Sequence, residues 1–379
     1  MMTVASPPLR QLSFASHKVL KDGSWIVVRI DLPDLPVICK IIKGDAEKLR
    51  REVTRIEALR ETFPTLAQLM PAIVGQGHLR GCMPEGRPYY LQEFVGGTTL
   101  GDALQQGGEI ATGAQAMLGP ILRALLDHVD EHRPIEMVDP RQWLFSSLTR
   151  ALDRLKDLPV IDTLARASSI VINGRRRDGL AACLARLLLM AEAMLPADAI
   201  TVSALGHWNF HAQNLILTDE KPTGFAIIDP DSSLETCDPM FGIARLLYSF
   251  PHDVAEQGGY RLVTDHLLRD EMPNPRFEVE FGWIHTAIAA YGALYHGLFA
   301  PGRLPRAVDL DRRLADPAQA LRLHLNLLLC LMRGAAVNHE PDFQVVDGNL
   351  RHLRNNGVFL YLHAVDLANT LLDTSRGRP

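Results

Sequence analysis

The segment over residues 205–231 constrains the fold of this chain more than any other stretch. It contains a polar turn, GHWNFHAQN, then the short apolar run LIL, and then a second apolar run, FAII, followed by acid at Asp229 and Asp231. Two apolar runs of this length, separated by a short turn, are typical of a β-hairpin. Its polar ends supply amide and carboxylate oxygens, which hard divalent cations prefer as ligands. The sequence therefore predicts a hairpin that carries metal-binding or reactive side chains.

The first hundred residues have the pattern of several strands and one helix. The β-branched runs over 24–32 and 36–42 are joined by a short turn of Pro and Asp, which predicts a hairpin. The segment 45–63 predicts a helix, because its apolar residues recur at helical spacing: Leu49, Val53, Ile56 and Leu59. Segments 71–79 and 88–95 predict further strands.

Gly96 and Gly97 interrupt this pattern and mark the best domain boundary in the sequence. A helix capped by Thr98 or Thr99 is expected to follow. Beyond it the chain reads as mostly helical, apart from the polar hairpin, and it lacks the strand–helix alternation of a doubly wound sheet. We therefore expect an α+β fold with a small β-rich N-terminal lobe over 1–97 and a large, mostly helical C-terminal lobe over 98–379.

Composition excludes several classes of protein. With 22% charged residues and a formal net charge of −5, the chain has no basic excess for binding nucleic acid. The longest apolar stretches, 180–195 and 323–332, are too short for a membrane span and predict buried helices. The five cysteines are dispersed, and no Cys/His spacing typical of zinc is present. The N-terminus lacks a signal peptide's apolar core, so we expect a cytoplasmic protein with reduced thiols.

Lys40 and Glu52 are candidates for a nucleotide phosphate site. Lys40 lies on the strand predicted over 36–42, and Glu52 lies in the helix that follows. In kinases a strand lysine contacts the α- and β-phosphates and is held by a glutamate one helix later. The alternative is a solvated strand lysine with a surface glutamate. Lys43 with Glu47 or Glu57 would replace the pair if the strand register differs.

The segment LQEFVGG has the character of a hinge between two lobes. Backbone groups near Glu93 and Val95 would bond the edge of an adenine, although an ordinary interdomain strand would look the same. A loop that covers phosphates should be rich in glycine, but LKDGSW supplies only Gly23 between the first two strands. We therefore expect this loop to contact the nucleotide phosphates in an altered way or not at all.

Two motifs together carry a resemblance to a known family. The run HWNFHAQN matches the pattern H-G-D-x-H-x-x-N at His207, His211 and Asn214. The run AIIDPDSSLETCDP supplies Asp229 and, loosely, Asp238 before a proline. The chain resembles the aminoglycoside phosphotransferase family, a branch of the protein-kinase-like fold, most clearly over 195–250. The resemblance implies a two-lobed protein-kinase-like fold.

The resemblance also implies ligands for ATP and Mg²⁺. Asn214 and Asp229 would hold the magnesium ion, through an amide oxygen and a carboxylate. Asp231 would either reach a second ion or remain a turn residue, and we favour the turn.

The remaining motif residues are expected to have structural roles. His207 occupies the motif's first position and is a candidate catalytic residue, but a hydrogen-bonded loop residue is the favoured reading. His211 is likewise expected to pack the loop. Asp238 is expected to cap the helix that begins near residue 240. The family usually has a second acid shortly after this position, where the present chain has Gly242.

Asn209 is the decisive departure from the family pattern. The family has an aspartate here that accepts or orients the proton of the acceptor hydroxyl. Asn209 can bond a hydroxyl but cannot act as a base. It is consistent with a slow or rewired kinase, with a pseudokinase, or with an engineered substitution, and the sequence leaves all three open.

The sequence thus supports an ATP- and Mg²⁺-dependent phosphotransferase that acts on a hydroxyl of a small molecule such as an antibiotic or sugar. The alternative is an impaired pseudokinase that binds nucleotide or a partner protein or peptide in a biosynthetic complex. The charges of the region 251–379 are mixed and do not specify a substrate.

Overall fold

The computed structural model describes most of the 379 residues. The described ranges are 16–22, 25–32, 36–43, 45–79, 86–106, 108–133, 139–159, 161–196, 202–230, 236–256, 258–264, 275–281, 316–338, 343–347 and 350–375. The sequence-predicted positions Gly23 and Asp231 lie outside these residues.

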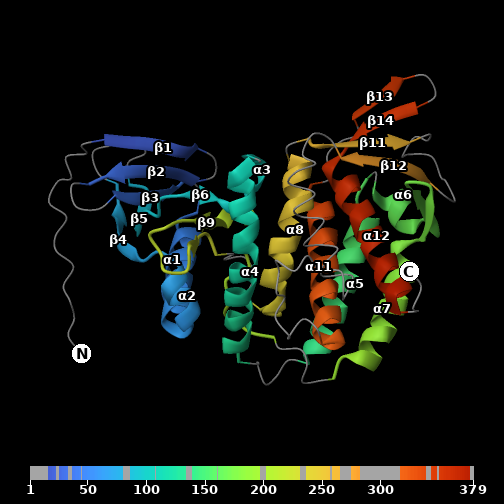
Figure 1. Ribbon diagram of the computed structural model, residues 1–379, viewed down its shortest axis with the longest axis horizontal. Helices are drawn as coiled ribbons and strands as arrows, with labels where there is room; N and C mark the ends of the chain where they lie inside the picture. The colour runs from blue at the N-terminus through green and yellow to red at the C-terminus, as the bar shows by residue number, and fades with distance from the viewer. Residues whose placement is uncertain are drawn as a thin grey trace. The chain divides into compact units, whose positions relative to one another are not determined.

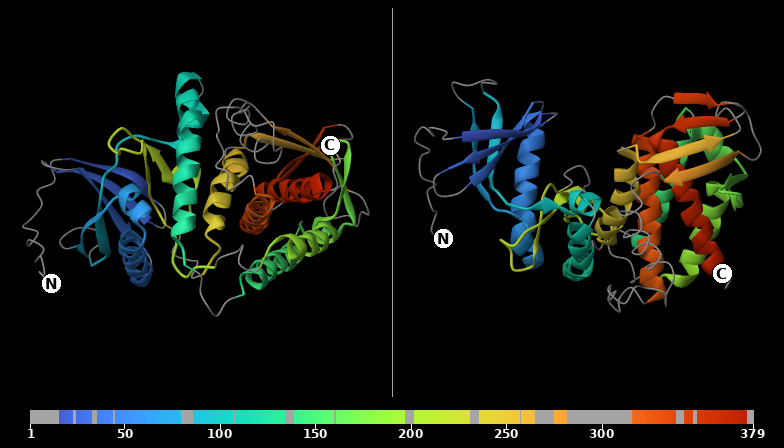
Figure 2. Two further views of the ribbon diagram at one scale, coloured as in Figure 1. Left: turned by 60° about the horizontal axis from the view of Figure 1, so that its bottom comes forward. Right: turned by 45° about the horizontal axis from the view of Figure 1, so that its top comes forward.

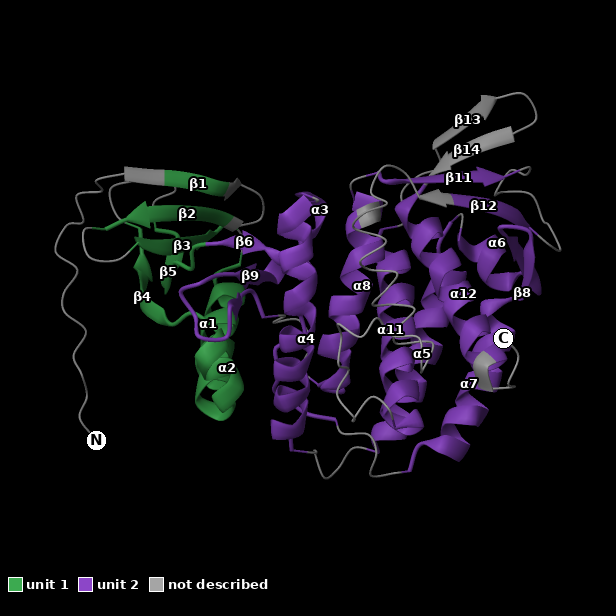
Figure 3. Cartoon of the chain, in the orientation of Figure 1, with its two compact units in different colours: residues 1–96 green, residues 97–379 purple. Residues whose placement is uncertain are grey.

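The chain forms two compact units, residues 1–96 (unit 1) and 97–379 (unit 2), which are coloured separately in Figure 3. Most of the described residues of unit 1 lie in one sheet and two helices. Unit 2 is mostly helical and contains two further sheets. The fold is therefore α+β, as the order of elements in the sequence predicts.

Unit 1 is built on a five-stranded antiparallel sheet in the order β1-β2-β3-β5-β4. Its strands are β1 (Ser16–Asp22), β2 (Trp25–Asp31), β3 (Pro36–Ile42), β4 (Ile73–His78) and β5 (Pro88–Glu93). One face of β2, β3 and β5 forms an apolar cluster that contains Ile30, Val37 and Leu91. Val37, Cys39 and Ile41 of β3 belong to this cluster, and because side chains alternate along a strand, Lys40 lies on the opposite face.

Helix α1 (Ala46–Thr62) forms where the helical spacing predicts it. Asp45 begins the helix, since its carboxylate accepts a hydrogen bond from the Glu47 N–H at 2.8 Å. The four apolar residues of the predicted stripe are buried, and so is Glu52. A short helix, α2 (Pro64–Leu69), follows with proline at its first turn. The buried face of α1 thus carries one acid among its apolar residues.

In unit 2, helices α4, α8, α11 and α12 run side by side (Figure 1), with α8 packed against both α4 and α11, and α11 against α12. The helices are α3 (Leu100–Gln106), α4 (Gly108–Glu131), α5 (Pro140–Lys156), α6 (Ile161–Arg166), α7 (Leu180–Met194), the 3₁₀ turn η1 (Ala212–Asn214), α8 (Met240–Glu256), α11 (Pro317–Val337) and α12 (Asn356–Ser375).

Helix α11 is long and apolar enough by length and composition to span a membrane, but 83% of that window is buried inside the protein. It packs against α8, α12 and α5. The predicted apolar helix over 323–332 is therefore the central core helix of unit 2.

The predicted polar hairpin is present as part of a three-stranded sheet in the order β10-β9-β6. Its strands are β6 (Thr98–Thr99), β9 (Leu215–Leu217) and β10 (Phe225–Ile227). Gly97 precedes β6 at φ +135°, and a Cβ there would collide with the Leu217 carbonyl. Glycine at this position therefore allows β6 to pair with β9.

Unit 2 also contains a six-stranded sheet that the sequence interpretation missed. The order is β13-β14-β11-β12-β7-β8, with β12 and β7 parallel and the other pairs antiparallel. The strands are β7 (Ser169–Ile172), β8 (Arg175–Asp178), β11 (Tyr260–Thr264), β12 (Arg276–Phe281), β13 (Phe343–Asp347) and β14 (Leu350–Arg354). Figures 1 and 2 show the sheet beside the beginning of α12. The lobe is mostly helical as predicted, but the sequence interpretation did not identify this sheet.

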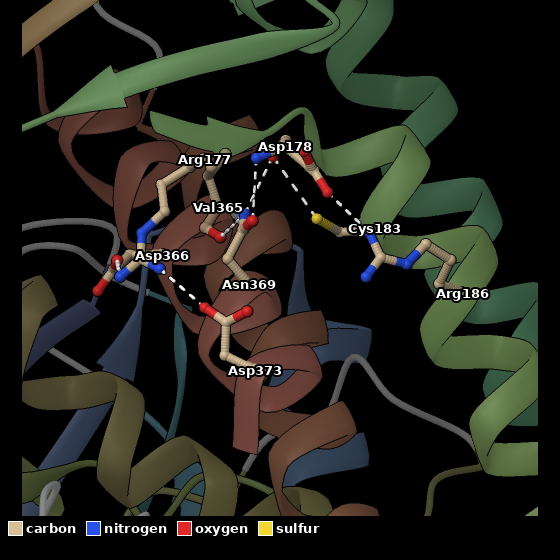
Figure 4. A network of polar contacts seen from close by, with 8 residues as sticks. All are labelled: Arg177, Asp178, Cys183, Arg186, Val365, Asp366, Asn369 and Asp373. Carbon is tan, nitrogen blue, oxygen red and sulfur yellow. Dashed lines mark hydrogen bonds and ion pairs between the residues drawn. The ribbon is translucent and has the colours of Figure 1, made fainter. Parts of the chain in front are cut away.

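A polar network joins the edge strand β8 to α12 (Figure 4). Asn369 accepts a hydrogen bond from the Asp178 N–H at 2.9 Å and donates one to the Asp178 carbonyl at 3.0 Å. Arg177 forms ion pairs with Asp366 at 2.6 Å and with Asp373 at 3.3 Å. Asn369 therefore pairs with the edge strand as another strand would, and it holds the hairpin on the helix.

Candidate functional site

Lys40 and Glu52 form a buried ion pair in unit 1. The Lys40 Nζ lies 3.3 Å from Glu52 Oε1, and each residue is 7% exposed. Tyr90, which is opposite Lys40 in the β3–β5 register, donates its hydroxyl to the same Glu52 oxygen at 2.5 Å. The lysine therefore lies between strand and helix with its ammonium group held by a carboxylate, as in the predicted phosphate site.

The structure distinguishes the Lys40–Glu52 pair from the alternative residues by burial. Lys43 is exposed, Glu57 is exposed, and Glu47 forms an ion pair with Arg50 at 2.7 Å on the surface of α1. A surface ion pair of this kind contributes little and specifies no site. The register that places Lys40 opposite Tyr90 thus selects Lys40 with Glu52 as the candidate pair.

Glu93 and Val95 lie at the end of β5 and just beyond it. The Glu93 carboxylate accepts a hydrogen bond from the Ala72 N–H at 3.0 Å, and its own N–H donates to the Ala72 carbonyl at 3.0 Å. Glu93 is therefore committed to holding the segment before β4. Among described partners, the Val95 N–H and carbonyl make no hydrogen bond. Val95 fits the predicted hinge role better than Glu93 does.

The loop before β9 brings three of the predicted site residues together. The Asn209 Nδ2 donates to the backbone carbonyl of Asp229 at 3.0 Å. The Asn214 Nδ2 donates to the Asn209 carbonyl at 3.1 Å, and the Asn214 carbonyl accepts from the Ile228 N–H at 2.9 Å. Asn209, Asn214 and Asp229 therefore form one hydrogen-bonded group, and all three are partly exposed.

Asp229 has a strained backbone. Its φ of +54° lies in the left-handed region, which a residue with a Cβ rarely adopts. Strain of this kind costs about 1–3 kcal/mol and concentrates at functional sites. The bond from Asn209 to the Asp229 carbonyl helps to hold this conformation.

His207 lies inside the protein rather than at the surface of the loop. It is 0% exposed, and its ring stacks on Phe210 with centroids 4.7 Å apart. Its Nδ1 accepts a hydrogen bond from the Asn209 N–H at 3.4 Å. The structure therefore places His207 behind Asn209, where it supports the loop, and this geometry favours the structural reading over a base.

Trp208 stands at the position where the family pattern has glycine. Its φ is +54°, a conformation that glycine adopts without strain. The indole is 1% exposed, lies against the Gly206 backbone, and stacks on His132 with centroids 5.4 Å apart. Burial of the large side chain offsets the strain, so packing holds the loop in a conformation that glycine would adopt freely.

His211 joins the loop to helix α8. Its Nδ1 accepts a hydrogen bond from the Gln213 N–H at 3.3 Å, which caps the turn η1. Its Nε2 lies 3.4 Å from the Asp253 carboxylate. Burial lowers the pKa of His211 to about 3, with smaller contributions from His252 and Arg245, so the ring is neutral at physiological pH. The expectation that His211 packs the loop is confirmed.

Asp238 caps α8 as predicted, because its Oδ1 accepts a hydrogen bond from the Met240 N–H at 2.8 Å. The sequence interpretation missed its other partners. Arg322 on α11 contacts both Asp238 oxygens, and the Asn326 Nδ2 donates to Oδ2 at 2.9 Å. Asp238 is 0% exposed and Arg322 is 4% exposed. This buried group joins the start of α8 to the core helix and is structural.

Gly242 lies where α8 approaches the ring of Phe210. A Cβ at this position would lie 2.6 Å from Cε2 of Phe210. Phe210 is also the ring on which His207 stacks. The loop and α8 therefore approach each other through an aromatic ring that leaves no space for a side chain at 242.

Comparisons with known proteins establish the fold of this chain as the two-lobed protein-kinase-like fold of the aminoglycoside phosphotransferases. One solved structure with this fold is a thermostable mutant of aminoglycoside phosphotransferase APH(4)-Ia in a ternary complex with ADP and hygromycin B (TM-score 0.51, 14% identity, 94% of each chain covered). Another is a second thermostable mutant of aminoglycoside phosphotransferase APH(4)-Ia, in a ternary complex with AMP-PNP and hygromycin B (TM-score 0.50, 13% identity, 96% of this chain and 95% of that chain covered). No protein-family model and no curated protein sequence matches the chain.

Proposed function

We propose that this protein binds a nucleoside triphosphate with Mg²⁺ and transfers a phosphoryl group to a hydroxyl of a small molecule. The observation that carries the proposal is the buried Lys40–Glu52 pair on a kinase-like sheet. Burial of an ion pair is costly unless its geometry is good and further hydrogen bonds are made. A solvated lysine on an edge strand would not be buried, whereas Lys40 is buried and held by Glu52, which also accepts the Tyr90 hydroxyl. Such a lysine is suited to contact phosphates.

Asn214 and Asp229 fit a magnesium ion by their chemistry. They offer an amide oxygen and a carboxylate, which are hard ligands. The Asn214 Nδ2 is engaged with the Asn209 carbonyl, and among described residues its Oδ1 accepts no hydrogen bond, so that oxygen is the atom left for a cation. Asn214 and Asp229 would hold the magnesium ion, which would supply positive charge to neutralise the phosphates.

Asn209 limits the proposed reaction. It can accept or donate a hydrogen bond to an acceptor hydroxyl but cannot take its proton. Loss of a general base costs ~10²–10⁴-fold in rate. Phosphoryl transfer depends mostly on positioning and electrostatic stabilisation, so a slow transfer is consistent with the remaining residues.

The substrate class is supported by similarity alone. The structures with the same fold hold ADP or AMP-PNP together with hygromycin B. We therefore propose ATP as the donor and a hydroxylated, sugar-containing compound as the acceptor. The mixed charge of unit 2 does not narrow this class.

Thermal unfolding with nucleotide tests the binding step. ATP with Mg²⁺ should raise the melting temperature, and ATP with EDTA should raise it much less, because a ligand of the native state stabilises it by mass action. Asp229→Ala should remove the magnesium-dependent part of the shift. Asp219→Ala, on the exposed turn between β9 and β10, is the matched control and should retain it. Wild-type protein that shows no shift with Mg²⁺ and ATP would refute the proposal.

The second candidate function is a protein that binds nucleotide without catalysis, and Asn209 is the observation that favours it. The two are distinguished by Asn209→Asp, assayed for ATP turnover against a panel of hydroxylated compounds. A protein with an acceptor site should gain ~10²–10⁴-fold in phosphoryl transfer. A variant that binds Mg²⁺ and ATP but gains nothing with any acceptor supports the binding protein, because a base without an oriented hydroxyl has nothing to deprotonate.

A further inference from the structure

Tyr90 on β5 lies beside the Lys40–Glu52 pair. It is 0% exposed and is opposite Lys40 in the register of β3 and β5. Its neighbours in the strand, Tyr89 and Leu91, pack with the apolar cluster on one face of the sheet. Because side chains alternate along a strand, Tyr90 points to the other face, where the Lys40 ammonium lies 5.7 Å from the centre of its ring.

The Tyr90 hydroxyl bonds the same carboxylate oxygen as the lysine does. It donates to Glu52 Oε1 at 2.5 Å, whereas Lys40 Nζ lies 3.3 Å from that oxygen. A distance of about 2.5–2.7 Å is typical of a hydroxyl that donates to an ionised carboxylate, and such bonds are roughly twice as strong as neutral ones. Of these two partners of Glu52 Oε1, the hydroxyl is therefore the closer.

Packing alone does not require a hydroxyl at this position. Phenylalanine has the same ring and would fill nearly the same volume, and burial of a hydroxyl is unfavourable unless it finds a hydrogen-bond partner. The partner of the Tyr90 hydroxyl is the one carboxylate oxygen that also contacts Lys40. The hydroxyl is thus tied to the Lys40–Glu52 pair, whereas the ring is tied to the core.

Glu52 connects α1 to two adjacent strands through these bonds. The contact with Lys40 attaches its carboxylate to β3, and the bond from Tyr90 attaches it to β5. A glutamate side chain has several rotatable bonds, and ordering it costs conformational entropy. The bond from Tyr90 keeps the carboxylate in place before a ligand arrives, and it does not depend on Lys40.

We propose that Tyr90 is a positioning residue for nucleotide phosphates: its hydroxyl holds the Glu52 carboxylate, and Glu52 in turn places the Lys40 ammonium. The proposal rests on the proposed function for the role of Lys40. Tyr90 acts on Glu52 and touches no phosphate in this scheme. A group that is already in place binds its ligand more tightly, because less conformational freedom is lost on binding.

Tyr90→Phe removes the hydroxyl and keeps the ring. Calorimetry should show ATP binding about three- to tenfold weaker, as expected for the loss of one hydrogen bond. Affinity for adenosine should not change, because adenosine has no phosphate for Lys40 to contact. Tyr89→Phe is the matched control, since it is the same substitution on the adjacent residue, which lies on the other face of the sheet. It should bind both ligands as wild type does.

The Lys40→Met background decides whether the hydroxyl acts through the lysine. The ammonium is absent there, so addition of Tyr90→Phe should weaken ATP binding no further. Three results would each overturn the proposal: an unchanged ATP affinity in Tyr90→Phe, equal losses for ATP and adenosine, or a further loss in the double variant. Equal losses would make Tyr90 a residue that only supports the fold.

Unfolding of the nucleotide-free protein by urea tests the bond to Glu52 without a ligand. Tyr90→Phe should raise the equilibrium constant of unfolding about tenfold or more, because hydrogen bonds to charged groups are the stronger ones. Its effect should be smaller in Glu52→Gln, which keeps an acceptor of the same size without the charge. The same effect in both backgrounds, or none, would show that the hydroxyl does not hold the carboxylate. If wild type binds no ATP, the proposed function fails, and the unfolding data still decide whether Tyr90 holds Glu52.

Discussion

The side-chain amide of Asn209 donates a hydrogen bond to the backbone carbonyl of Asp229, 3.0 Å away. A carboxylate at the same position could not make this bond, because an ionised acid only accepts. Asn209 therefore has a structural role. It is a donor that holds the backbone of a residue at φ +54°.

Asn209→Asp should therefore destabilise the protein even if it increases catalysis. The new carboxylate would face the Asp229 carbonyl with no donor between them, at a cost of about 1–3 kcal/mol. Urea denaturation at pH 7 should show this loss. Asn209→Ala is the control, since it removes the bond without adding charge and should cost less. A variant as stable as wild type would mean that the bond contributes nothing.

Lys40→Met should lower both the stability of the protein and its affinity for ATP, and a second substitution separates the two effects. Removing the ammonium group leaves Glu52 buried with Tyr90, and an unpaired buried charge costs about 3–5 kcal/mol. The double variant Lys40→Met/Glu52→Gln should recover most of that stability without recovering affinity for ATP. Stability is measured by denaturant and affinity by calorimetry. Lys43→Met, at an exposed position, should change neither, and a loss of affinity there would move the phosphate contact to Lys43.

Asp238→Ala should be among the most damaging substitutions in unit 2. It would leave the Arg322 guanidinium buried without its carboxylate, at a cost of about 3–5 kcal/mol, in addition to the loss of the α8 cap. Asp238→Ala/Arg322→Met should be less damaging than Asp238→Ala alone, because it removes the unpaired charge. Denaturant unfolding of the three proteins measures this, and equal losses would show that the pair is not coupled.

Gly242→Ala should destabilise α8 although alanine favours helices. Its Cβ would meet the Phe210 ring at 2.6 Å, and overpacking costs about 1–3 kcal/mol. Gly113→Ala on α4 is the matched control, since no atom lies within 4 Å of its Cβ, and it should stabilise by up to about 1 kcal/mol. Thermal unfolding distinguishes the two. A stabilising Gly242→Ala would show that Phe210 moves without cost.

Acid should weaken the fold through its buried histidines. Burial lowers the pKa of His324 to about 3, and burial with the nearby His128 and Arg322 lowers that of His132 to about 2. Below pH 6.5 the unfolded chain binds protons that these folded groups exclude, so the free energy of unfolding falls as pH falls. Each group contributes up to about 1.4 kcal/mol per pH unit between pH 6.5 and its folded pKa. Urea titrations at pH 7, 6 and 5 measure how steeply the free energy of unfolding depends on pH. The substitution His324→Met should reduce this slope, because the unfolded chain then takes up one proton fewer.

The sequence predicts the parts of this fold that depend on local pattern. The stripe on α1, the cap at Asp238 and the polar hairpin each follow from residues a few positions apart. The pairing of Lys40 with Glu52 rather than Lys43 with Glu57 needed the register of β3 against β5, which the sequence left open. Asn209 was identified as the departure from the family, but its bond to the carbonyl of Asp229, 20 residues away, was not.

What the sequence interpretation missed depends mostly on residues distant in the chain. Arg322 lies 84 residues beyond Asp238, and nothing local pairs them. The six-stranded sheet is different, because part of its signal was available. Asn173 and Gly174 form a two-residue hairpin turn at φ +50° and +73°, and Asn-Gly between β-branched and polar residues is a strong hairpin signal.

Trp208 has a consequence for how this protein can be observed. The chain has four tryptophans, and Trp208 immediately precedes Asn209 in the sequence. Its side chain is 1% exposed and stacks on the neutral ring of His132. Indole emission depends on local polarity and on neighbouring rings, so any ligand that shifts the loop should change the colour or intensity of this fluorophore. Trp208→Phe would identify its share of the signal. The chain thus contains an intrinsic optical reporter beside Asn209, and occupancy of the loop can be followed without a label and before any substrate is known.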